Sequence, residues 1–430
     1  MAHTAVGSEK PPTWSRENSR SRWGLLVALA VDNVGSGLFL PLVLVYSVQV
    51  VGLSVGFAGT LLFLGTLLGL GAPLVVGTVV DRFGPRRVVI TSQLLQTVGM
   101  TLYLLAGTVG SSGGAGWGSG VVLAIGGAVL VAAGTQTFYS SLFSLISAVA
   151  GDGPKDGAFA HVEMIRSAAF GLGALVAAAL LTWLDTPALR IAVAVDALTF
   201  LLAAGLLWRL VAGDLRVHRA DGAPAAQPVT TGAPRPWRDR PFLVLLVLMA
   251  LTGLATDVFL VGFSVWALDR LHAPAWVPGA CVVLLTAVTS TGAGLVVRWT
   301  STWKRTRTVA LGTALTIVWC AMCAGAPLIG RSWQPVWLLV ATGVLACSGM
   351  LTGRVMAMAE ASAPVHAHGR YMATVQYSFN AAALLAPLLV GLFAVGSWLP
   401  WAAVASGCAG ALVLLPWLAR RLPARAVSAQ

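Results

Sequence analysis

Three aspartates lie inside long apolar stretches of the chain, where a carboxyl group could carry proton chemistry. Asp32 lies near the middle of the first stretch, Asp196 lies in the sixth and Asp257 in the seventh. An ionisable side chain inside a membrane span costs roughly 2.5–3.5 kcal/mol on insertion scales, so each one needs a reason. Because burial disfavours the charged form of a carboxyl group, such a residue can bind and release a proton near neutral pH. We expect Asp32 to couple a proton, with Asp257 and Asp196 as further candidates. A purely structural Asp32, hydrogen-bonded to a neighbouring helix, is the alternative.

Other polar side chains within the apolar stretches could line a binding cavity or form a gate. The expected cavity residues are Asn33, Gln93, Gln136, Tyr139, Arg354, Gln376, Tyr377 and Asn380. Glu163 and Arg166 are three residues apart, so they share one helix face and can pair. We expect this pair to act as a gate or as a packing ion pair, in preference to a direct contact with a substrate.

The composition indicates which elements must hold these residues. Hydrophobic residues make up 57% of the 430 residues, only 10% are charged, and the mean hydropathy is +0.84. Ordinary soluble domains carry about 25% charged residues, and a helix of about 20 apolar residues is long enough to cross a bilayer. Twelve stretches reach that length, at residues 23–48, 54–79, 88–108, 119–149, 160–184, 188–211, 241–268, 275–298, 308–329, 334–361, 371–395 and 398–419. The sequence therefore predicts an all-α membrane protein with twelve transmembrane helices.

A polar segment rich in Pro, Ala and Arg divides these stretches six and six, as a linker between two bundles would. The predicted parts are an N-terminal tail (1–22), an N-terminal six-helix bundle (23–212), a linker (213–240), a C-terminal six-helix bundle (241–419) and a C-terminal tail (420–430). The halves read as parallel repeats, because Gly157 before the fifth stretch lines up with Gly369 before the eleventh. Two pseudo-symmetric bundles with a site between them at mid-membrane are the plan of a transporter.

The basic residues predict the orientation in the membrane. With both termini in the cytoplasm, 22 of the 27 Lys and Arg residues fall on the cytoplasmic side, and Arg190, Arg270 and Arg331 fall outside. An excess of Lys and Arg in cytoplasmic loops is the rule for membrane proteins. We therefore expect a multi-pass protein of the inner (plasma) membrane with both termini cytoplasmic. The net charge of +12 is therefore explained by the basic cytoplasmic loops, and it does not indicate nucleic-acid binding.

A short charged turn between the second and third stretches stands out from these loops. Its pattern is formed by Gly77, Asp81, Arg82, Gly84, Arg86 and Arg87. Gly84 and Pro85 can make a tight reversal, and Asp81 is close enough to the next helix start to accept hydrogen bonds from free backbone N–H groups. A generic positive-inside loop would explain the arginines but not the Gly-x-x-x-Asp-Arg-x-Gly spacing.

This spacing, its place after two of twelve spans and the six-plus-six plan resemble the major facilitator superfamily along nearly the whole chain. The resemblance implies a secondary transporter whose loop from Gly77 to Arg87 stabilises one of two conformations. One departure is Pro85, which stands where the family usually has a basic residue. The phrase from Val195 to Phe200 around Asp196 resembles the sixth helix of drug- and siderophore-exporting members. Two further departures from the family's exporter pattern are that the fourth stretch has no arginine, where many proton-coupled exporters carry one, and that the fifth has only a trace of the antiporter motif.

From these features we expect proton-coupled export of a hydrophobic or amphipathic small molecule, a drug or secondary metabolite, by a monomer that alternates access. Proton-coupled uptake is the runner-up, and a non-transporting membrane sensor on the same fold is the rival from another class. Enzymatic chemistry is not expected, because no acid–base or metal-ligating constellation is present. The five cysteines lie in apolar stretches and read as packing residues, so neither a metal nor a cofactor is predicted.

Overall fold

The computed structural model of the chain describes residues 19–54, 57–58, 61, 64, 67, 70–111, 117–151, 155–212, 235–264, 266–274 and 276–428. All regular structure in these described ranges is helical. The expected N-terminal tail up to residue 18, ten of the 26 residues of the second predicted span and most of the linker lie outside the described residues. The chain is an all-α membrane protein, as its composition predicts.

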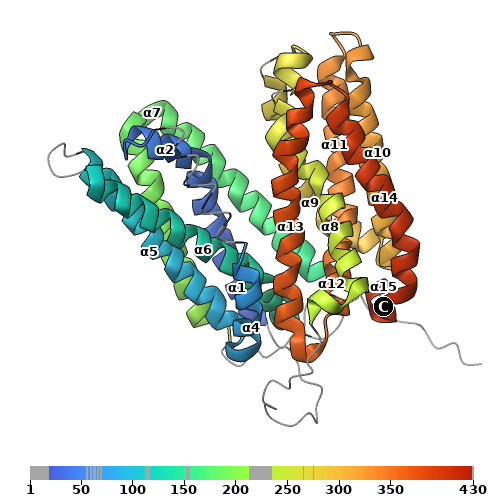
Figure 1. Ribbon diagram of the computed structural model, residues 1–430, viewed down its shortest axis with the longest axis horizontal. Coiled ribbons are helices and arrows are strands. Elements are labelled where there is room, and N and C mark those ends of the chain that lie inside the picture. The colour runs from blue at the N-terminus through green and yellow to red at the C-terminus, as the bar shows by residue number, and fades with distance from the viewer. Residues whose placement is uncertain are drawn as a thin grey trace, which may run out of the picture.

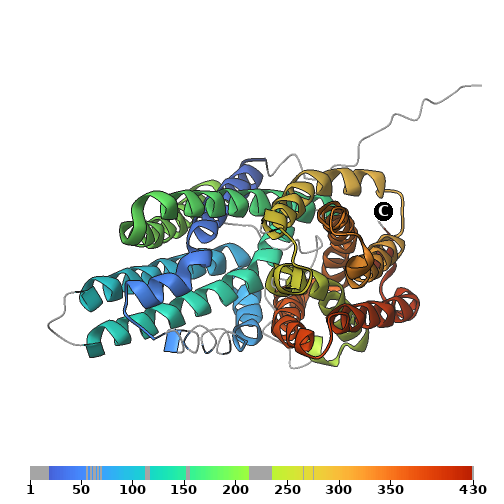
Figure 2. The same cartoon turned by 90° about the horizontal axis from the view of Figure 1, so that it is seen from above.

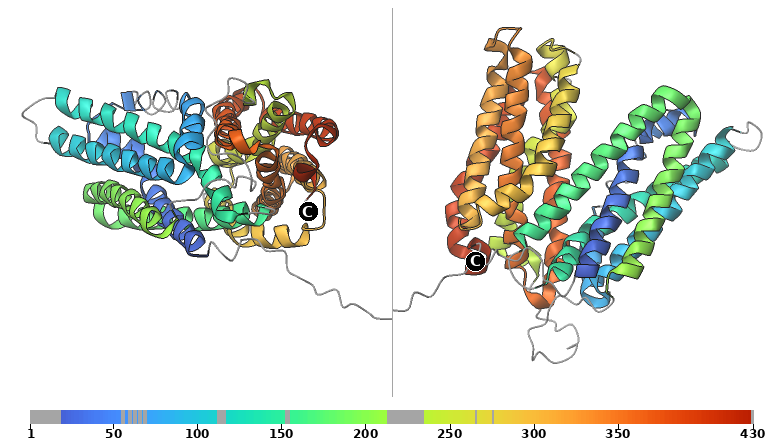
Figure 3. Two further views of the ribbon diagram at one scale, coloured as in Figure 1. Left: turned by 90° about the horizontal axis from the view of Figure 1, so that it is seen from below. Right: turned by 180° about the vertical axis from the view of Figure 1, so that it is seen from behind.

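The N-terminal bundle begins with a helix that is interrupted toward its C-terminal end. Its elements are α1 (Ser19–Phe39), the 3-10 turn η1 (Leu40–Leu42), α2 (Val43–Gln49), α4 (Ala72–Phe83), α5 (Pro85–Ser111), α6 (Trp117–Ala150) and α7 (Asp156–Leu210). The long α7 holds the fifth and sixth predicted spans, as segments Asp156–Ala177 and Leu189–Leu210. These two segments run in opposite directions (Figure 3), so both can pack on α1.

The C-terminal bundle has the same plan with more interruptions. It comprises η2 (Pro236–Arg238), α8 (Arg240–Val258), the π-helical segments η3 (Phe259–Phe263) and η4 (Trp266–Arg270), α9 (Trp276–Trp299), α10 (Arg305–Gly325), η5 (Ala326–Leu328), α11 (Gln334–Thr352), α12 (Arg354–Ser362), η6 (Val365–Ala367), α13 (His368–Gly391), η7 (Leu392–Ala394), α14 (Leu399–Arg421) and α15 (Ala424–Val427). The tenth predicted span is thus divided at Gly353, and the expected C-terminal tail contains one short helix.

Ten described segments are long and apolar enough to cross a membrane. They correspond to ten of the twelve predicted spans. The first span is divided by η1 into α1 and α2, and the second is described mainly at its end, in α4. In the part of the chain that the structure describes, the twelve predicted spans are represented by these ten segments together with α1, α2 and α4. They form two bundles, which Figure 2 shows side by side from above.

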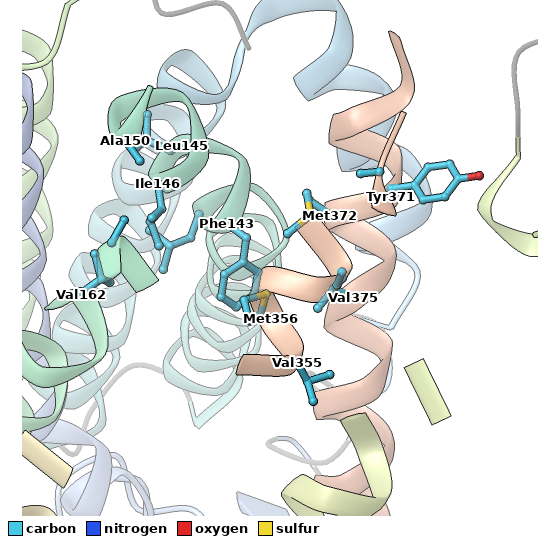
Figure 4. Close-up of a cluster of buried hydrophobic side chains, with 14 of the residues drawn as sticks. Phe143, Leu145, Ile146, Ala150, Val162, Val355, Met356, Tyr371, Met372 and Val375 are labelled. Atoms are coloured by element: carbon cyan, nitrogen blue, oxygen red, sulfur yellow. The ribbon is translucent and has the colours of Figure 1, made fainter. Parts of the chain in front are cut away.

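The two bundles meet at one end and diverge toward the other (Figure 1). We call these the closed end and the open end; α7 finishes and α8 starts at the closed end. A buried apolar cluster at the closed end takes residues from both bundles. Figure 4 shows Phe143 of α6 close to Met356 of α12 and to Met372 of α13. Each of the three further clusters belongs to one bundle alone, so among the described residues only the closed end has a shared core.

Candidate functional site

Asp32 is buried in the N-terminal bundle and is held by two amide side chains. The residue is 5% exposed. Gln93 of α5 donates from Nε2 to Asp32 Oδ1 over 3.0 Å, and Asn33 donates from Nδ2 to Oδ2 over 3.2 Å. Asn33 also donates to the backbone oxygen of Leu29 over 2.8 Å. Asn33 and Gln93 therefore position Asp32, and Gln93 itself is fully buried.

Asp196 lies close to Asp32, on the neighbouring helix α7. It is 3% exposed, and its Oδ1 atom has no hydrogen-bond partner. A methyl group on Gly35 of α1 would come within 2.7 Å of this oxygen and would clash with the hydroxyl of Thr199. Gly35 thus lets α1 and α7 approach closely enough for Asp32 and Asp196 to act on each other electrostatically. The structure brings these two predicted proton residues together.

Asp257, the third predicted proton residue, lies in the other bundle. It is partly exposed on α8. Within the described part of the chain, no hydrogen bond or ion pair reaches its carboxylate. Asp257 is therefore an isolated acid, unlike the pair in the N-terminal bundle.

Glu163 and Arg166 form an ion pair on the first half of α7. Arg166 Nη1 lies 3.4 Å from Glu163 Oε2, and Arg166 Nη2 donates to the hydroxyl of Tyr139 over 3.2 Å. The guanidinium also lies over the Tyr139 ring, 5.2 Å from its centroid. Ser167 donates to Glu163 Oε1 over 3.2 Å. Arg166 is within electrostatic range of Asp32, so this group adjoins the carboxyl pair.

A chain of amide groups crosses from one bundle to the other. Gln376 donates to Asn380 Oδ1 over 3.3 Å, and Asn380 donates to Gln136 Oε1 on α6 over 3.4 Å. Tyr377 donates to the backbone oxygen of Leu70 over 2.7 Å, ahead of α4. Four of the predicted cavity residues therefore lie along the seam between the bundles.

The predicted charged turn packs the start of α5 onto the end of α7. Gly84 ends α4 with φ +83°, a left-handed conformation that favours glycine. Arg86 donates to the backbone oxygen of Leu207 over 3.2 Å and to that of Trp208 over 2.5 Å. A cation suits these carbonyls because they end a helix. Arg82 lies over the Phe83 ring, and Arg87 is exposed.

Two other residues of this turn contact the opposite bundle. The backbone N–H of Gly369 donates to Asp81 Oδ1 over 2.7 Å, and Arg370 Nε donates to Oδ2 over 3.2 Å. A methyl group on Gly77 would lie 2.7 Å from the Arg370 Cα atom. Partial burial raises the pKa of Asp81, an effect that the hydrogen bonds from Gly369 and Arg370 reduce. Gly77 thus allows α4 to approach the start of α13 closely, and Asp81 accepts the hydrogen bonds between them.

A cluster of ion pairs also joins the two bundles at the closed end, and it was not predicted from the sequence. Asp156, the first residue of α7, forms ion pairs with Arg305 Nη2 over 2.5 Å and with Arg354 Nη1 over 2.9 Å. All three side chains are 4% exposed. Beside them, Lys155 Nζ lies 2.6 Å from Glu360 Oε1, and His368 lies 3.5 Å from the same oxygen.

The correspondence between the two halves of the sequence could have indicated that these charged residues lie at the same end of the molecule. Asp156 precedes Gly157 as His368 precedes Gly369, and Arg305 belongs to the charged loop of the second half. Arg354, predicted for the cavity, instead joins Asp156 and donates to Val297 O over 2.9 Å and to Thr300 Oγ1 over 2.5 Å. The structure therefore places Arg354 at the closed end, away from the amide chain.

The sequence matches the family model of the Major Facilitator Superfamily over residues 25–355, more than three quarters of the chain. It is similar to an MFS-type transporter of Mycobacterium tuberculosis, with 26% identity over 391 residues that cover 85% of this chain and 82% of the relative.

Solved structures share the fold at low sequence identity. A bacterial homologue of the iron transporter ferroportin, in an outward-facing state, gives a TM-score of 0.70 at 16% identity and covers 92% of this chain and 99% of its own. The human organic anion transporter MFSD10 (TETRAN) gives a TM-score of 0.65 at 13% identity, covering 93% of this chain and 100% of its own. Identities this low establish the fold and not the substrate.

Proposed function

This chain belongs to the Major Facilitator Superfamily, and we propose that it is a proton-coupled exporter of hydrophobic or amphipathic small molecules. The family makes it a secondary transporter and not an enzyme. The proposal adds the proton as coupling ion, export as direction, and a drug or secondary metabolite as substrate. It also keeps the predicted location in the plasma membrane, the cytoplasmic termini and the monomeric state.

The single observation that carries the proposal is the buried carboxyl pair of Asp32 and Asp196. Two neighbouring carboxylates repel each other, and a buried oxygen without a donor is costly, so binding a proton relieves both penalties. Gln93 and Asn33 stabilise the ionised form of Asp32 through their hydrogen bonds. The pair can therefore exist in a protonated and a deprotonated form, as a proton-coupling site must. Asp257 is a second proton candidate in the other bundle.

The closed end supports an assignment of the conformation. α7 ends and α8 begins at this end, and the basic residues of the sequence between them favour a cytoplasmic location for it. On that orientation the structure is outward-facing, like the bacterial homologue with which it shares its fold. Asp81, with Gly369 and Arg370, and Asp156, with Arg305 and Arg354, would hold this state and separate when the bundles rock.

The transport cycle follows from these two assignments. In the outward-facing state the substrate leaves and protons bind to Asp32 and Asp196 from the outside. Protonation removes buried charge, so the bundles can rock and open the cytoplasmic end. The protons are released inside, and a new substrate binds among the seam residues, which include Gln136, Gln376, Tyr377 and Asn380. Substrate export and proton entry then alternate.

The sign of the driving gradient tests export by exchange against uptake by symport. Purified protein in liposomes is given a panel of lipophilic cations and neutral drugs, with protein-free liposomes correcting for passive trapping. Exchange predicts accumulation when the lumen is acidic, because protons leave as substrate enters. Accumulation only with an alkaline lumen would replace export with symport, and accumulation independent of the gradient would remove the proton from the account.

A further inference from the structure

We propose, resting on the transport function above, that Glu163 and the ring of Tyr139 form a site for planar organic cations. Arg166 occupies this site as a tethered stand-in when no substrate is bound. The inference therefore names a substrate class, organic cations whose charge is spread over a flat group, and assigns their recognition to two residues of the N-terminal bundle.

The contacts of the Arg166 guanidinium define the site. A flat cation lies over an aromatic face, 5.2 Å from the Tyr139 centroid, beside a carboxylate oxygen at 3.4 Å. Aromatic rings and carboxylates are the groups that bind such cations. The contacts are also incomplete: the Nε–H of Arg166 is buried without a hydrogen-bond partner. A ligand that meets the ring and the carboxylate more closely can displace it.

The exposed charge at this place is negative, which favours a cation over an anion. The Glu163 side chain is 63% exposed, whereas that of Arg166 is 17% exposed. Asp32 adds a further carboxyl group within electrostatic range of Arg166, so two acids adjoin the one base. An approaching anion would meet Glu163 first and be repelled. An approaching cation would be attracted by the same group.

Glu163 is largely exposed and precedes a residue that lies at the seam between the bundles. The next residue, Met164, has its sulfur 3.6 Å from where a methyl group on Gly294 of α9 would lie. On the other side, Gln136 is one helical turn before Tyr139 and accepts a hydrogen bond from Asn380 of α13. The cation site thus lies between the contacts that α7 makes with α9 and those that α6 makes with α13.

The site also adjoins the proposed proton residues. Asp32 is within electrostatic range of Arg166. When a ligand takes the place of the guanidinium, the charge that Asp32 faces is rearranged. The substrate site and the proton site would therefore be coupled electrostatically, although no residue belongs to both.

The test uses three probes of one shape and different charge: biphenyl-4-carboxamidinium, biphenyl-4-carboxamide and biphenyl-4-carboxylate. Their affinities are measured by equilibrium dialysis of the purified full-length protein, with detergent alone as background. We expect the amidinium to bind at least about tenfold more tightly than the amide, since cation–π and carboxylate contacts to a desolvated cation are worth roughly 1–2 kcal/mol. Glu163→Gln should remove this charge preference, so that the amidinium and the amide bind with similar affinities, while Glu163→Asp should keep most of the preference.

Arg166→Gln is the decisive variant, because it removes the competitor and keeps the ring and the carboxylate. It should bind the amidinium more tightly than the wild type by about tenfold. The proposal is overturned if the amidinium and the amide bind equally in the wild type. It is equally overturned if the carboxylate binds best and Arg166→Gln abolishes that binding, which would make this an anion site.

Dialysis applies no gradient, so the result separates the two proposals. Charge selectivity without gradient-driven transport would leave the cation site standing and remove proton coupling. Gradient-driven transport without charge selectivity would do the reverse.

Discussion

The Asp81 carboxylate accepts a 2.7 Å hydrogen bond from the backbone N–H of Gly369, although 288 positions separate the two residues in the sequence. This bond caps the start of α13 with a side chain from the opposite bundle. It is possible because Gly77, one turn earlier on α4, brings no side chain between the helices. Two residues on one turn of α4 therefore allow the close approach of the bundles and form the hydrogen bond between them at the closed end.

Replacing Asp81 with Ala should slow transport without abolishing substrate binding. The change removes two hydrogen bonds and leaves the Gly369 N–H without its acceptor, at a cost of roughly 1–3 kcal/mol to this conformation. We expect transport in liposomes to fall about tenfold, with a binding constant within about twofold of the wild type. Unchanged transport would show that Asp81 has no role in the conformational cycle.

Replacing Gly77 with Ala should separate the bundles at the closed end. The added methyl group would lie 2.7 Å from the Arg370 Cα atom, where the backbone has to move. Spin labels introduced by Thr91→Cys and His366→Cys, in a background without the native cysteines, report the distance across this end. The distance should lengthen in Gly77→Ala.

Gly205→Ala is the matched control, because a methyl group there would meet nothing within 4 Å. Its distance distribution should match that of the wild type. If Gly77→Ala also matched the wild type, the helix crossing would not need glycine.

Replacing Asp156 with Asn should destabilise the protein. Arg305 and Arg354 would lose their buried carboxylate, and breaking a buried ion pair from one side costs about 3–5 kcal/mol. Thermal unfolding in detergent should begin several degrees lower, and Asp156→Glu should recover part of the loss. Equal unfolding temperatures for wild type and Asp156→Asn would mean that the cluster does not stabilise this state.

Replacing Asp196 with Asn should reduce proton-driven transport while preserving the fold. Asp196 Oδ1 has no hydrogen-bond partner, so a neutral amide of the same size loses no contact at that atom. We expect an unfolding temperature within about 3 °C of the wild type and a clear loss of gradient-driven accumulation. Full accumulation in Asp196→Asn would exclude this residue from proton coupling.

The sequence predicted the spans and the charged turn because both depend on local features. A long apolar stretch must become a helix in a membrane, whatever its neighbours are. The turn at Gly84 depends only on the ability of glycine to adopt a positive φ angle. The ion pair of Glu163 and Arg166 is local in the same sense, since three residues place two side chains on one helix face.

Contacts between distant helices could not be predicted in this way. Gln93 binds Asp32 across 61 positions and Arg305 binds Asp156 across 149, and both contacts depend on how each helix is rotated in its bundle. Hydropathy fixes the length of a span but not its rotation. The same uncertainty put Arg354 among the cavity residues, although it lies in the ion cluster of the closed end.

The central claim, that protons on Asp32 drive transport, is tested most directly by comparing wild type with Asp32→Asn in two assays on the same liposomes. One assay measures accumulation driven by an acidic lumen, and the other measures exchange of labelled for unlabelled substrate without any gradient. The account predicts that Asp32→Asn loses gradient-driven accumulation and keeps the exchange, because the substrate path is intact and only the proton site is gone. Equal accumulation by both proteins would contradict it and would move proton coupling to another residue.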